Sequence, residues 1–452
     1  MHAISGEGGE RQIMVALTTS QTRALEEIIA AQASARPTHL LTGYAGSGKT
    51  TLMQAVARHF QAQNLVVVIT APTHKATAVL RSKVDKEMDC RTIQSLLSLQ
   101  PSAQGAKTSL VRSKRPQTIA DGVVIVDECS MLSAELMNWI RELLKYCFVL
   151  FVGDPAQLPP VGEGASPSFS VPSRSHLDTV VRQAADNPIL AAATAIRKNQ
   201  GNAPDWGWVK VAKHGQLGLF VPKDTESWLR KAFLSEAFDA DNDWCRYLCW
   251  TNERASQVNQ MIRRWRYGDD TPTPFMPGER VVSRSPVSRQ SEEGPRLCIV
   301  TNEEVMVLAI RESRLGYAFK ACGDLPGWST NIPSWEITLL SSSGEEVTAH
   351  MPKDQRDVDA ADRRLVREAK SQHKRWNQRF SFLNSLLKLQ PIYAMTVHTS
   401  QGSTFTNAFI DLSDIGRRAS ENPLETQQLC YVAITRATDM VFLVNTRGIS
   451  HA

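Results

Sequence analysis

The 452-residue sequence has no long hydrophobic run, and this absence argues against a membrane-spanning helix. Its longest apolar runs, residues 65–69 and 148–152, have the length of strands, whereas a helix that crosses a bilayer needs roughly 20 apolar residues. The N-terminal region carries acids at Glu7 and Glu10 and has no apolar signal-peptide core. We therefore expect a soluble, cytoplasmic protein without a membrane partner.

Cysteine is scarce, with eight residues and no Cys-x-x-Cys pair. This scarcity argues against a disulfide scaffold and a structural zinc site. No excess of one charge is present either, because 51 basic and 46 acidic residues give +5, which permits a polyanionic partner without requiring one. Hydrophobic residues at 42% and charged residues at 21% are typical of a globular chain, and the length suggests about three domains.

Apolar strand-like runs alternate with helical patterns between residues 38 and 152. This alternation predicts parallel βαβ units, which bind ligands at the carboxyl ends of their strands. A second alternating region starts at residue 247 and is interrupted by short strand-like runs, which predict a small β-barrel, and by a highly charged helical stretch over 354–379. The predicted organisation is a flexible lead-in (1–16), a first core (17–200) with an insert at about 90–120, a second core (201–276 and 392–452) and a second insert (277–391).

The segment Gly43-Tyr-Ala-Gly-Ser-Gly-Lys49-Thr50 fits the pattern G-x-x-x-x-G-K-[ST], and it lies between a predicted strand and a predicted helix. Glycines let backbone N–H groups converge on phosphate oxygens, Lys49 reaches the β- and γ-phosphates, and the Thr50 hydroxyl is a ligand for Mg²⁺. The segment therefore predicts binding of a nucleoside triphosphate. The predicted contacts are Gly43, Ala45, Gly46, Ser47, Gly48, Lys49, Thr50 and Thr51.

Two adjacent carboxylates, Asp127 and Glu128, end the apolar run of residues 123–126. At the carboxyl end of a strand, Asp127 can hold the Mg²⁺ that Thr50 also contacts, while Glu128 can polarise the attacking water. This pair favours hydrolysis of the triphosphate over phosphorylation of a small molecule.

Three more segments follow in order: Gly153-Asp-Pro-Ala-Gln157-Leu-Pro-Pro, Thr396-Val-His398-Thr-Ser-Gln401-Gly402 and Tyr431-Val-Ala-Ile-Thr435-Arg436. With them, the sequence resembles the superfamily 1 helicases, and within these the branch that contains Dda and RecD, over nearly the whole chain. The resemblance implies an α/β fold of two RecA-like P-loop NTPase cores, with a β-hairpin pin inserted in the first and an SH3-like β-barrel in the second. It also implies an ATP- and Mg²⁺-dependent DNA helicase that moves 5′ to 3′ on single-stranded DNA and unwinds forked duplex.

The resemblance assigns roles to further residues around the triphosphate. Gln21 is expected to read the adenine edge, and Gln157 to sense the γ-phosphate. Arg436, supplied by the second core, and Arg182, ahead of it in the chain, are expected to face the γ-phosphate across a cleft, because guanidinium groups neutralise transition-state charge. For Arg182, an ion-pair role at the surface is the alternative.

The resemblance also implies contacts to the nucleic acid. Pro72, Thr73, His74 and Lys75 are the expected strand contacts of the first core, and His398 and Thr399 those of the second. Residues 90–120 hold no acid but several basic side chains, and they are expected to form the pin, with Leu110 and Val111 as candidates for its apolar wedge. An unstructured basic loop is the alternative for this stretch.

Other functions stay open at this point. A translocase that strips proteins without unwinding and an ATPase switch controlled by nucleic acid fit the same motifs, whereas Glu128 and the second arginine-bearing core disfavour a nucleotide or metabolite kinase. The resemblance favours DNA over RNA. We expect a monomer, with a single-strand-binding, replication or recombination protein as a further partner.

Overall fold

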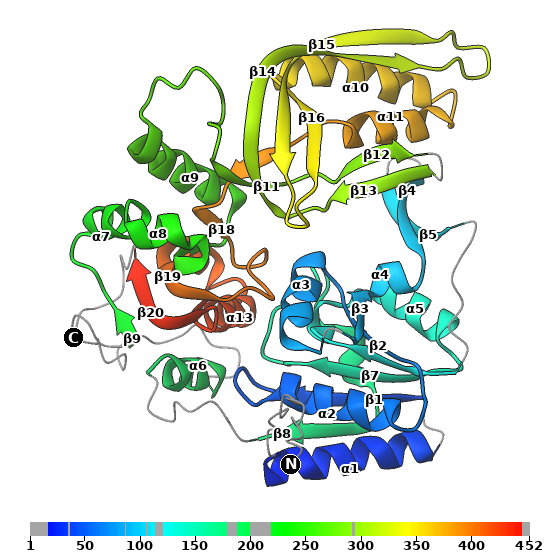
Figure 1. Ribbon diagram of the computed structural model, residues 1–452, viewed down its shortest axis with the longest axis vertical. Helices are drawn as coiled ribbons and strands as arrows, with labels where there is room; N and C mark the ends of the chain where they lie inside the picture. The colour runs from blue at the N-terminus through cyan, green and yellow to red at the C-terminus, as the bar shows by residue number, and fades with distance from the viewer. Residues whose placement is uncertain are drawn as a thin grey trace, which may run out of the picture.

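The structure is a computed structural model, and its described residues form three units (Figure 1). These are a first α/β core, a second α/β core and a unit inserted in the second core, which lies above both cores in this view. None of the helices in these residues has the length and apolar character needed to cross a membrane. The described residues are 17–34, 37–85, 87–104, 107–113, 121–178, 188–198, 218–291 and 294–444.

The first core is a parallel sheet with strand order β3-β2-β6-β7-β1-β8 and helices on both faces. Its central strands are buried from end to end, as expected for a sheet covered on both sides. The strands are β1 (Thr38–Gly43), β2 (Val67–Ala71), β3 (Asp89–Thr92), β6 (Val123–Val126), β7 (Phe148–Gly153) and β8 (Arg174–Leu177). The helices are α1 (Thr19–Ala33), α2 (Lys49–Gln61), α3 (His74–Lys83), α4 (Ile93–Leu96) and α5 (Ala134–Leu143).

The second core is another parallel sheet, with strand order β18-β10-β19-β20-β9. Its strands are β9 (Gly218–Phe220), β10 (Cys245–Cys249), β18 (Ala394–Thr396), β19 (Phe405–Asp411) and β20 (Ala437–Val444). Its helices are α6 (Pro188–Lys198), α7 (Thr225–Phe233), α8 (Glu236–Ala240), α9 (Asn252–Tyr267), α12 (Leu412–Ile415) and α13 (Pro423–Ile434). These strands and the motif segments at their ends agree with the predicted second core.

Helix α6 lies before the predicted boundary between the cores at residue 200, yet it packs on the second core. Helix α6 packs its buried face, Ile189, Ala192, Ala193 and Ile196, into the hydrophobic cluster of the second core, next to α13 and β20. An amphipathic helix reveals in its sequence that it has an apolar face, but not which sheet covers that face.

The inserted unit contains an antiparallel sheet with strand order β16-β15-β14-β11-β17. Two long strands dominate it, and the predicted charged helical stretch forms two helices packed on the sheet rather than one. The strands are β11 (Arg280–Ser283), β14 (Glu304–Phe319), β15 (Trp328–Leu340), β16 (Glu346–Pro352), β17 (Leu389–Pro391) and the separate hairpin β12 (Val287–Ser291) and β13 (Gly294–Ile299). The helices are α10 (Gln355–Ala369) and α11 (Arg375–Asn384).

A second hairpin, β4 (Leu99–Gln104) and β5 (Lys107–Arg112), extends from the first core toward the inserted unit (Figure 1). Its ladder runs from the pair Leu99 and Arg112 to the pair Gln104 and Lys107, so the turn lies between these last two residues. Strand β4 contacts α11 of the inserted unit. The acid-free stretch therefore contains an ordered hairpin, and the alternative of a wholly unstructured loop is wrong.

Candidate functional site

The glycine-rich segment forms a phosphate loop between β1 and α2. Gly46 and Gly48 have φ angles of 81° and 79°, a left-handed conformation that glycine adopts without steric cost. The Lys49 ammonium donates hydrogen bonds to the carbonyl oxygens of Gly43 and Tyr44, at 2.7 and 3.0 Å. The Ser47 hydroxyl is buried without a hydrogen-bond partner among the described residues. A cradle with an unsatisfied donor and a helix N-terminus fits the phosphates of a nucleoside triphosphate.

Asp127 and Glu128 lie at the carboxyl end of β6 and line the same cavity as Lys49 and Thr50. Burial raises the pKa of Asp127 to about 7, and the neighbouring charge of Glu128 adds to the rise. Glu128 has a φ angle of 52°, which turns the chain away from the strand. Thr50 and Asp127 offer the oxygen ligands that suit Mg²⁺ alongside phosphate oxygens.

Gln21 is buried beside the phosphate loop. Its side-chain amide donates to the carbonyl of Gly48 at 3.2 Å, and its side-chain oxygen accepts from the backbone N–H of Thr18 at 2.9 Å. Gln21 thus joins the start of α1 to the start of α2, and its contact with an adenine remains a prediction. Thr51 follows Thr50 in the first turn of α2.

The second core contributes Arg436 to the cavity that contains Lys49 and Glu128. Its guanidinium donates to the carbonyl oxygens of Val432 and Ser403, at 3.1 and 3.0 Å. The structure therefore brings the predicted arginine and the predicted phosphate loop together across the boundary between the cores. Arg182 lies outside the described residues.

Gln157 also lines this cavity, and its side-chain oxygen is buried without a hydrogen-bond partner among the described residues. Its backbone carbonyl accepts a hydrogen bond from the Gln428 side chain of the second core at 3.1 Å. The next carbonyl, that of Leu158, accepts from Gln401 at 3.4 Å. This segment of the first core is thus held by two glutamines of the second.

Tyr431 makes the most direct polar link between the cores. Its hydroxyl donates to the buried carboxylate of Asp154 at 2.6 Å and accepts from the backbone N–H of Ala45 at 3.0 Å. Ala45 belongs to the phosphate loop, so one residue of α13 contacts both the loop and the end of β7. A second link is the Arg197 guanidinium of α6, which lies 3.2 Å from the centre of the Tyr44 ring.

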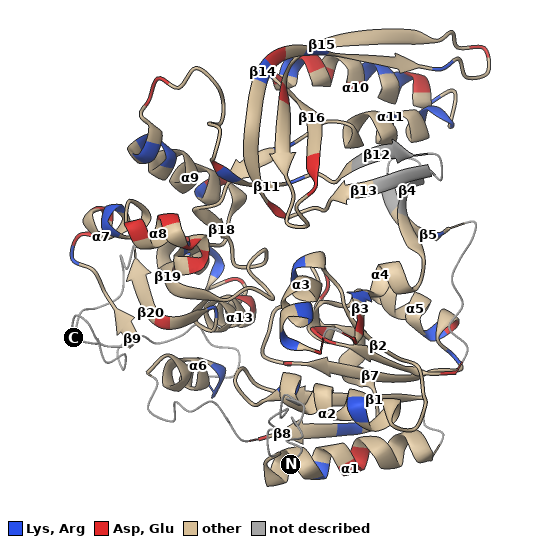
Figure 2. Ribbon diagram, in the orientation of Figure 1, with Lys and Arg blue, Asp and Glu red and all other residues tan. Residues whose placement is uncertain are grey.

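The predicted strand contacts of the first core lie at the start of α3. Thr73 caps the helix through a hydrogen bond from the Ala76 N–H, and the Pro72 carbonyl accepts from Gln94. His74 and Lys75 line a cavity between α3 and the inserted unit. Burial lowers the pKa of His74, so its imidazole is neutral at pH 7. Figure 2 shows basic residues on α3 and β3 at this side of the first core.

The predicted strand contacts of the second core, His398 and Thr399, line a different cavity at the end of β18. Thr399 is fixed through a 3.0 Å hydrogen bond between its hydroxyl and that of Thr396. Burial lowers the pKa of His398, which leaves this imidazole neutral as well. The two sets of residues thus lie in separate cavities.

Lys75 takes part in an ionic junction with Glu304, Arg246 and Asp243. The Lys75 ammonium lies 3.5 Å from the Glu304 carboxylate, which also pairs with the fully buried Arg246 at 3.1 Å. Arg246 pairs in turn with Asp243 at 3.0 Å. Burial alone would raise the pKa of Glu304, but Arg246 and Lys75 together lower it. All three units meet at this ionic junction.

Leu110 and Val111, the candidates for the apolar wedge of the pin, do not lie at the end of the hairpin ladder. Both residues lie within β5, away from the turn between Gln104 and Lys107. Leu110 packs against the hydrophobic cluster of the first core, and its backbone N–H donates to Glu135 at 2.9 Å. These contacts hold this part of β5 on α5.

Comparison with known proteins agrees with this geometry. An AAA domain model matches residues 16–217, and a UvrD-like helicase C-terminal domain model matches residues 391–444. The ATP-dependent DNA helicase dda of Enterobacteria phage T4 is 25% identical over 458 residues, which cover 95% of this chain and 99% of that protein. These matches support a superfamily 1 helicase similar to Dda and Pif1.

A second relative and a solved structure are also similar to this helicase. The ATP-dependent DNA helicase Pif1 of Psychrobacter sp. (strain PRwf-1) is 25% identical over 423 residues, which cover 82% of this chain and 61% of that protein. A solved structure, from work on DNA unwinding at forked duplex DNA by two coordinating Pif1 helicases, aligns with a TM-score of 0.50 and 16% identity. The alignment covers 95% of this chain and 92% of that chain, and it confirms the fold of two RecA-like cores.

Sequence reasoning missed several residues that join the units of this helicase. Tyr431 lies on α13 and stands in the same motif segment as Arg436, which follows the end of that helix, and this shared segment is the one signal in the sequence that could have found it. Arg197, Glu304 and Arg246 gave no such signal, because each lies outside the motif segments and finds its partner only in the folded chain.

Proposed function

We propose that this helicase couples ATP hydrolysis to 5′-to-3′ movement along single-stranded DNA and to separation of duplex DNA. The observation that carries this proposal is the shared cavity of Lys49, Glu128 and Arg436, which draws on both cores. A hydrolytic site completed by a residue of each core makes the distance between the cores depend on the bound nucleotide.

The residues of the cavity divide the chemistry of hydrolysis among them. Lys49 would neutralise charge on the β- and γ-phosphates, and Arg436 would stabilise the charge that develops in the transition state. Glu128 would orient the attacking water and accept its proton. Thr50 and Asp127 would hold Mg²⁺, which neutralises phosphate charge when it is bound. Gln21 would contact the adenine.

Hydrolysis is transmitted to the nucleic acid through contacts between the cores. Gln157 lines the ATP cavity, while Gln428 and Tyr431 of α13 contact its segment and the phosphate loop. We infer that the strand lies over Thr73 and His74 on the first core and over His398 and Thr399 on the second. Alternate grip by the two cores would then advance the strand with each ATP.

The hairpin of β4 and β5 is proposed to act as the pin that parts the duplex, and the sheet of the inserted unit as an SH3-like barrel that supports it. The contact between β4 and α11 supports this assignment, because it braces the hairpin from the second core's insert. The compact hairpin and the β-rich insert also support the 5′-to-3′ direction, since helicases of the opposite polarity generally carry larger, helical inserts in both cores. A monomer acting in the cytoplasm on single strands and forked duplexes fits this arrangement.

The test uses two partial duplexes, one with a 5′ single-stranded tail and one with a 3′ tail, in single-turnover unwinding with ATP. We expect efficient unwinding of the 5′-tailed duplex alone and ATPase activity that rises with single-stranded DNA. Unwinding of the 3′-tailed duplex alone would refute the direction. Strand-stimulated ATPase without unwinding of either duplex would instead indicate a protein-stripping translocase or an ATPase switch.

A further inference from the structure

A cavity of about 750 Å³ lies between the two cores, on the side that carries His398 and Thr399. The first core lines it with residues 158–164, and the second core lines it with the ends of β10 and β18. This volume falls within the range of about 300–1,000 Å³ that is typical of ligand pockets. The cavity is separate from the one that contains Lys49 and Arg436.

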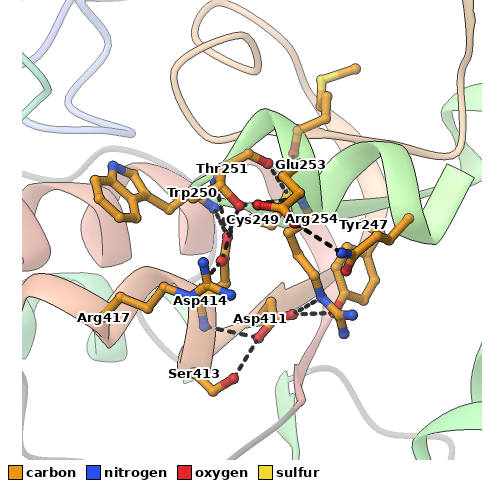
Figure 3. Close-up of polar contacts among 12 residues, drawn as sticks. Tyr247, Cys249, Trp250, Thr251, Glu253, Arg254, Asp411, Ser413, Asp414 and Arg417 are labelled. Carbon is orange, nitrogen blue, oxygen red and sulfur yellow. Dashed lines mark hydrogen bonds and ion pairs between the residues drawn. The ribbon is translucent and has the colours of Figure 1, made fainter.

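Trp250 lines this cavity directly after the end of β10. The backbone N–H groups of Trp250 and Thr251 both donate to the buried carboxylate of Asp414, at 2.9 and 2.8 Å. Figure 3 shows the indole ring pointing away from the polar network of Asp411, Asp414 and Arg254. The backbone of Trp250 is therefore fixed, while its half-buried ring packs against the hydrophobic cluster of the second core and lines the cavity.

The cavity is apolar on one part of its wall. Val161 is 86% exposed and Leu424 is 50% exposed, and both line it together with Pro159 and Pro160. Large apolar side chains with this much exposure are unusual enough to indicate a contact surface when they gather around one cavity.

The wall also carries two arginines, Arg284 and Arg418, and two glutamates, Glu163 and Glu425. The Arg418 guanidinium lies 6.0 Å from the centre of the Trp250 ring. Arg284, from the end of β11, is half-buried, donates a hydrogen bond to the Asn302 side chain and forms no ion pair among the described residues. The two carboxylates of the wall have partners of their own, since Glu163 accepts from the Ala134 N–H at 3.0 Å and Glu425 from Asn422 at 2.9 Å.

We propose that this cavity binds one nucleotide of the single strand, with Trp250 stacked on its base and Arg284 in contact with the adjacent phosphate. The proposal rests on the proposed function, because it names the residues that hold the strand on the second core. A flat aromatic ring next to apolar side chains suits a base, and a half-buried guanidinium that has no acidic partner among the described residues suits a phosphate.

The position of the cavity also connects the base to the ATP cycle. Leu158 and Pro159 line this cavity, while Gln157, the residue before them, lines the ATP cavity. A base on Trp250 would thus face a loop of the first core that responds to the nucleotide through Gln157. Closing the cores would tighten the contact, and opening them would loosen it.

The experiment compares the full chain with Trp250→Ala and Trp250→Phe variants in binding to a single-stranded oligonucleotide and to matched oligonucleotides with one abasic position each. We expect Trp250→Ala to weaken binding roughly 5- to 100-fold, the effect of losing one stacked base, and Trp250→Phe to retain most of the affinity. One abasic position should weaken binding by the wild type to a similar degree and have little further effect on Trp250→Ala. Trp265→Ala is the matched control, because the Trp265 ring stacks on Arg230 at 4.2 Å and lies outside the cavity.

Arg284→Met tests the phosphate contact separately. The slope of the logarithm of affinity against the logarithm of salt concentration should decrease in magnitude by about one. Abasic positions that weaken the wild type and Trp250→Ala equally would overturn the stacking assignment, and so would full affinity of Trp250→Ala for the intact strand. Absence of strand binding by the wild type would instead refute the proposed function.

Discussion

Replacing Glu304 by glutamine tests the ionic junction of Lys75, Glu304, Arg246 and Asp243. The Glu304 carboxylate neutralises Arg246, which is fully buried, and it also pairs with Lys75. Removing one partner of a buried ion pair costs about 3–5 kcal/mol, because the remaining charge stays in a low-dielectric site. Arg246 keeps Asp243, so we expect the lower end of this range, about 3 kcal/mol.

Lys75→Met provides the matched comparison. Glu304 would keep its 3.1 Å contact with Arg246, and methionine would preserve much of the apolar stem of the lysine. We therefore expect a loss of only about 1 kcal/mol, the usual worth of a partly exposed pair. Equilibrium urea unfolding, followed by circular dichroism, measures both variants. Equal losses, or a larger loss in Lys75→Met, would refute the view that Arg246 is the charge that needs Glu304.

The pH dependence of the free energy of unfolding tests Glu304 in a second way. A carboxylate whose pKa is lowered in the folded protein contributes stability above its ordinary pKa and loses it as the pH falls. The pKa of Glu304 is lowered, so the stability difference between the wild type and Glu304→Gln should narrow below about pH 4.3, the ordinary value of a glutamate. A difference that stays constant down to pH 3 would show that the charge of Glu304 is not what stabilises the junction.

Three further variants test the catalytic and unwinding parts. Glu128→Gln should retain ATP binding and lose hydrolysis, because an amide cannot accept the proton of the water, and equilibrium binding with steady-state turnover separates the two. Arg436→Ala should lower kcat by up to about 10³-fold with a small change in ATP affinity, since its contact strengthens in the transition state; a change confined to KM would contradict this role. Replacing residues 107–115 by a Gly-Ser linker should abolish unwinding and leave strand-stimulated ATPase, whereas parallel loss of both would place the hairpin in the strand-gripping core.

The sequence predicted the two sheets well because their strands are buried on both faces. Such strands appear as continuous apolar runs, as in residues 123–126 and 148–152, and the functional side chains follow their carboxyl ends. The phosphate loop and Asp127 could therefore be predicted from their pattern and position, whereas Arg436 was implied by the family resemblance, and all of them line one cavity.

The contacts between the three units could not be predicted from the sequence. Helix α6 was placed in the first core by the predicted boundary but packs on the second, because an apolar helix face does not specify its partner. Leu110 was a candidate for the wedge because an apolar side chain in a basic stretch has the same pattern whether it projects or packs. No sequence pattern marks Glu304 and Arg246 as partners, because they become neighbours only in the folded chain.

The strands at the two ends of the inserted unit are hydrogen-bonded neighbours, with Val281 paired to Pro391. The chain thus leaves the second core and returns to it at one place, which is the geometry that lets a core accept a foreign domain without a change in its own folding. The segment between these two strands can therefore be exchanged in evolution, or by protein engineering, between related helicases. The inserted unit nevertheless affects the second core, because it carries Glu304, the carboxylate that neutralises the buried Arg246 of that core. A successful graft must therefore supply a carboxylate at the position of Glu304.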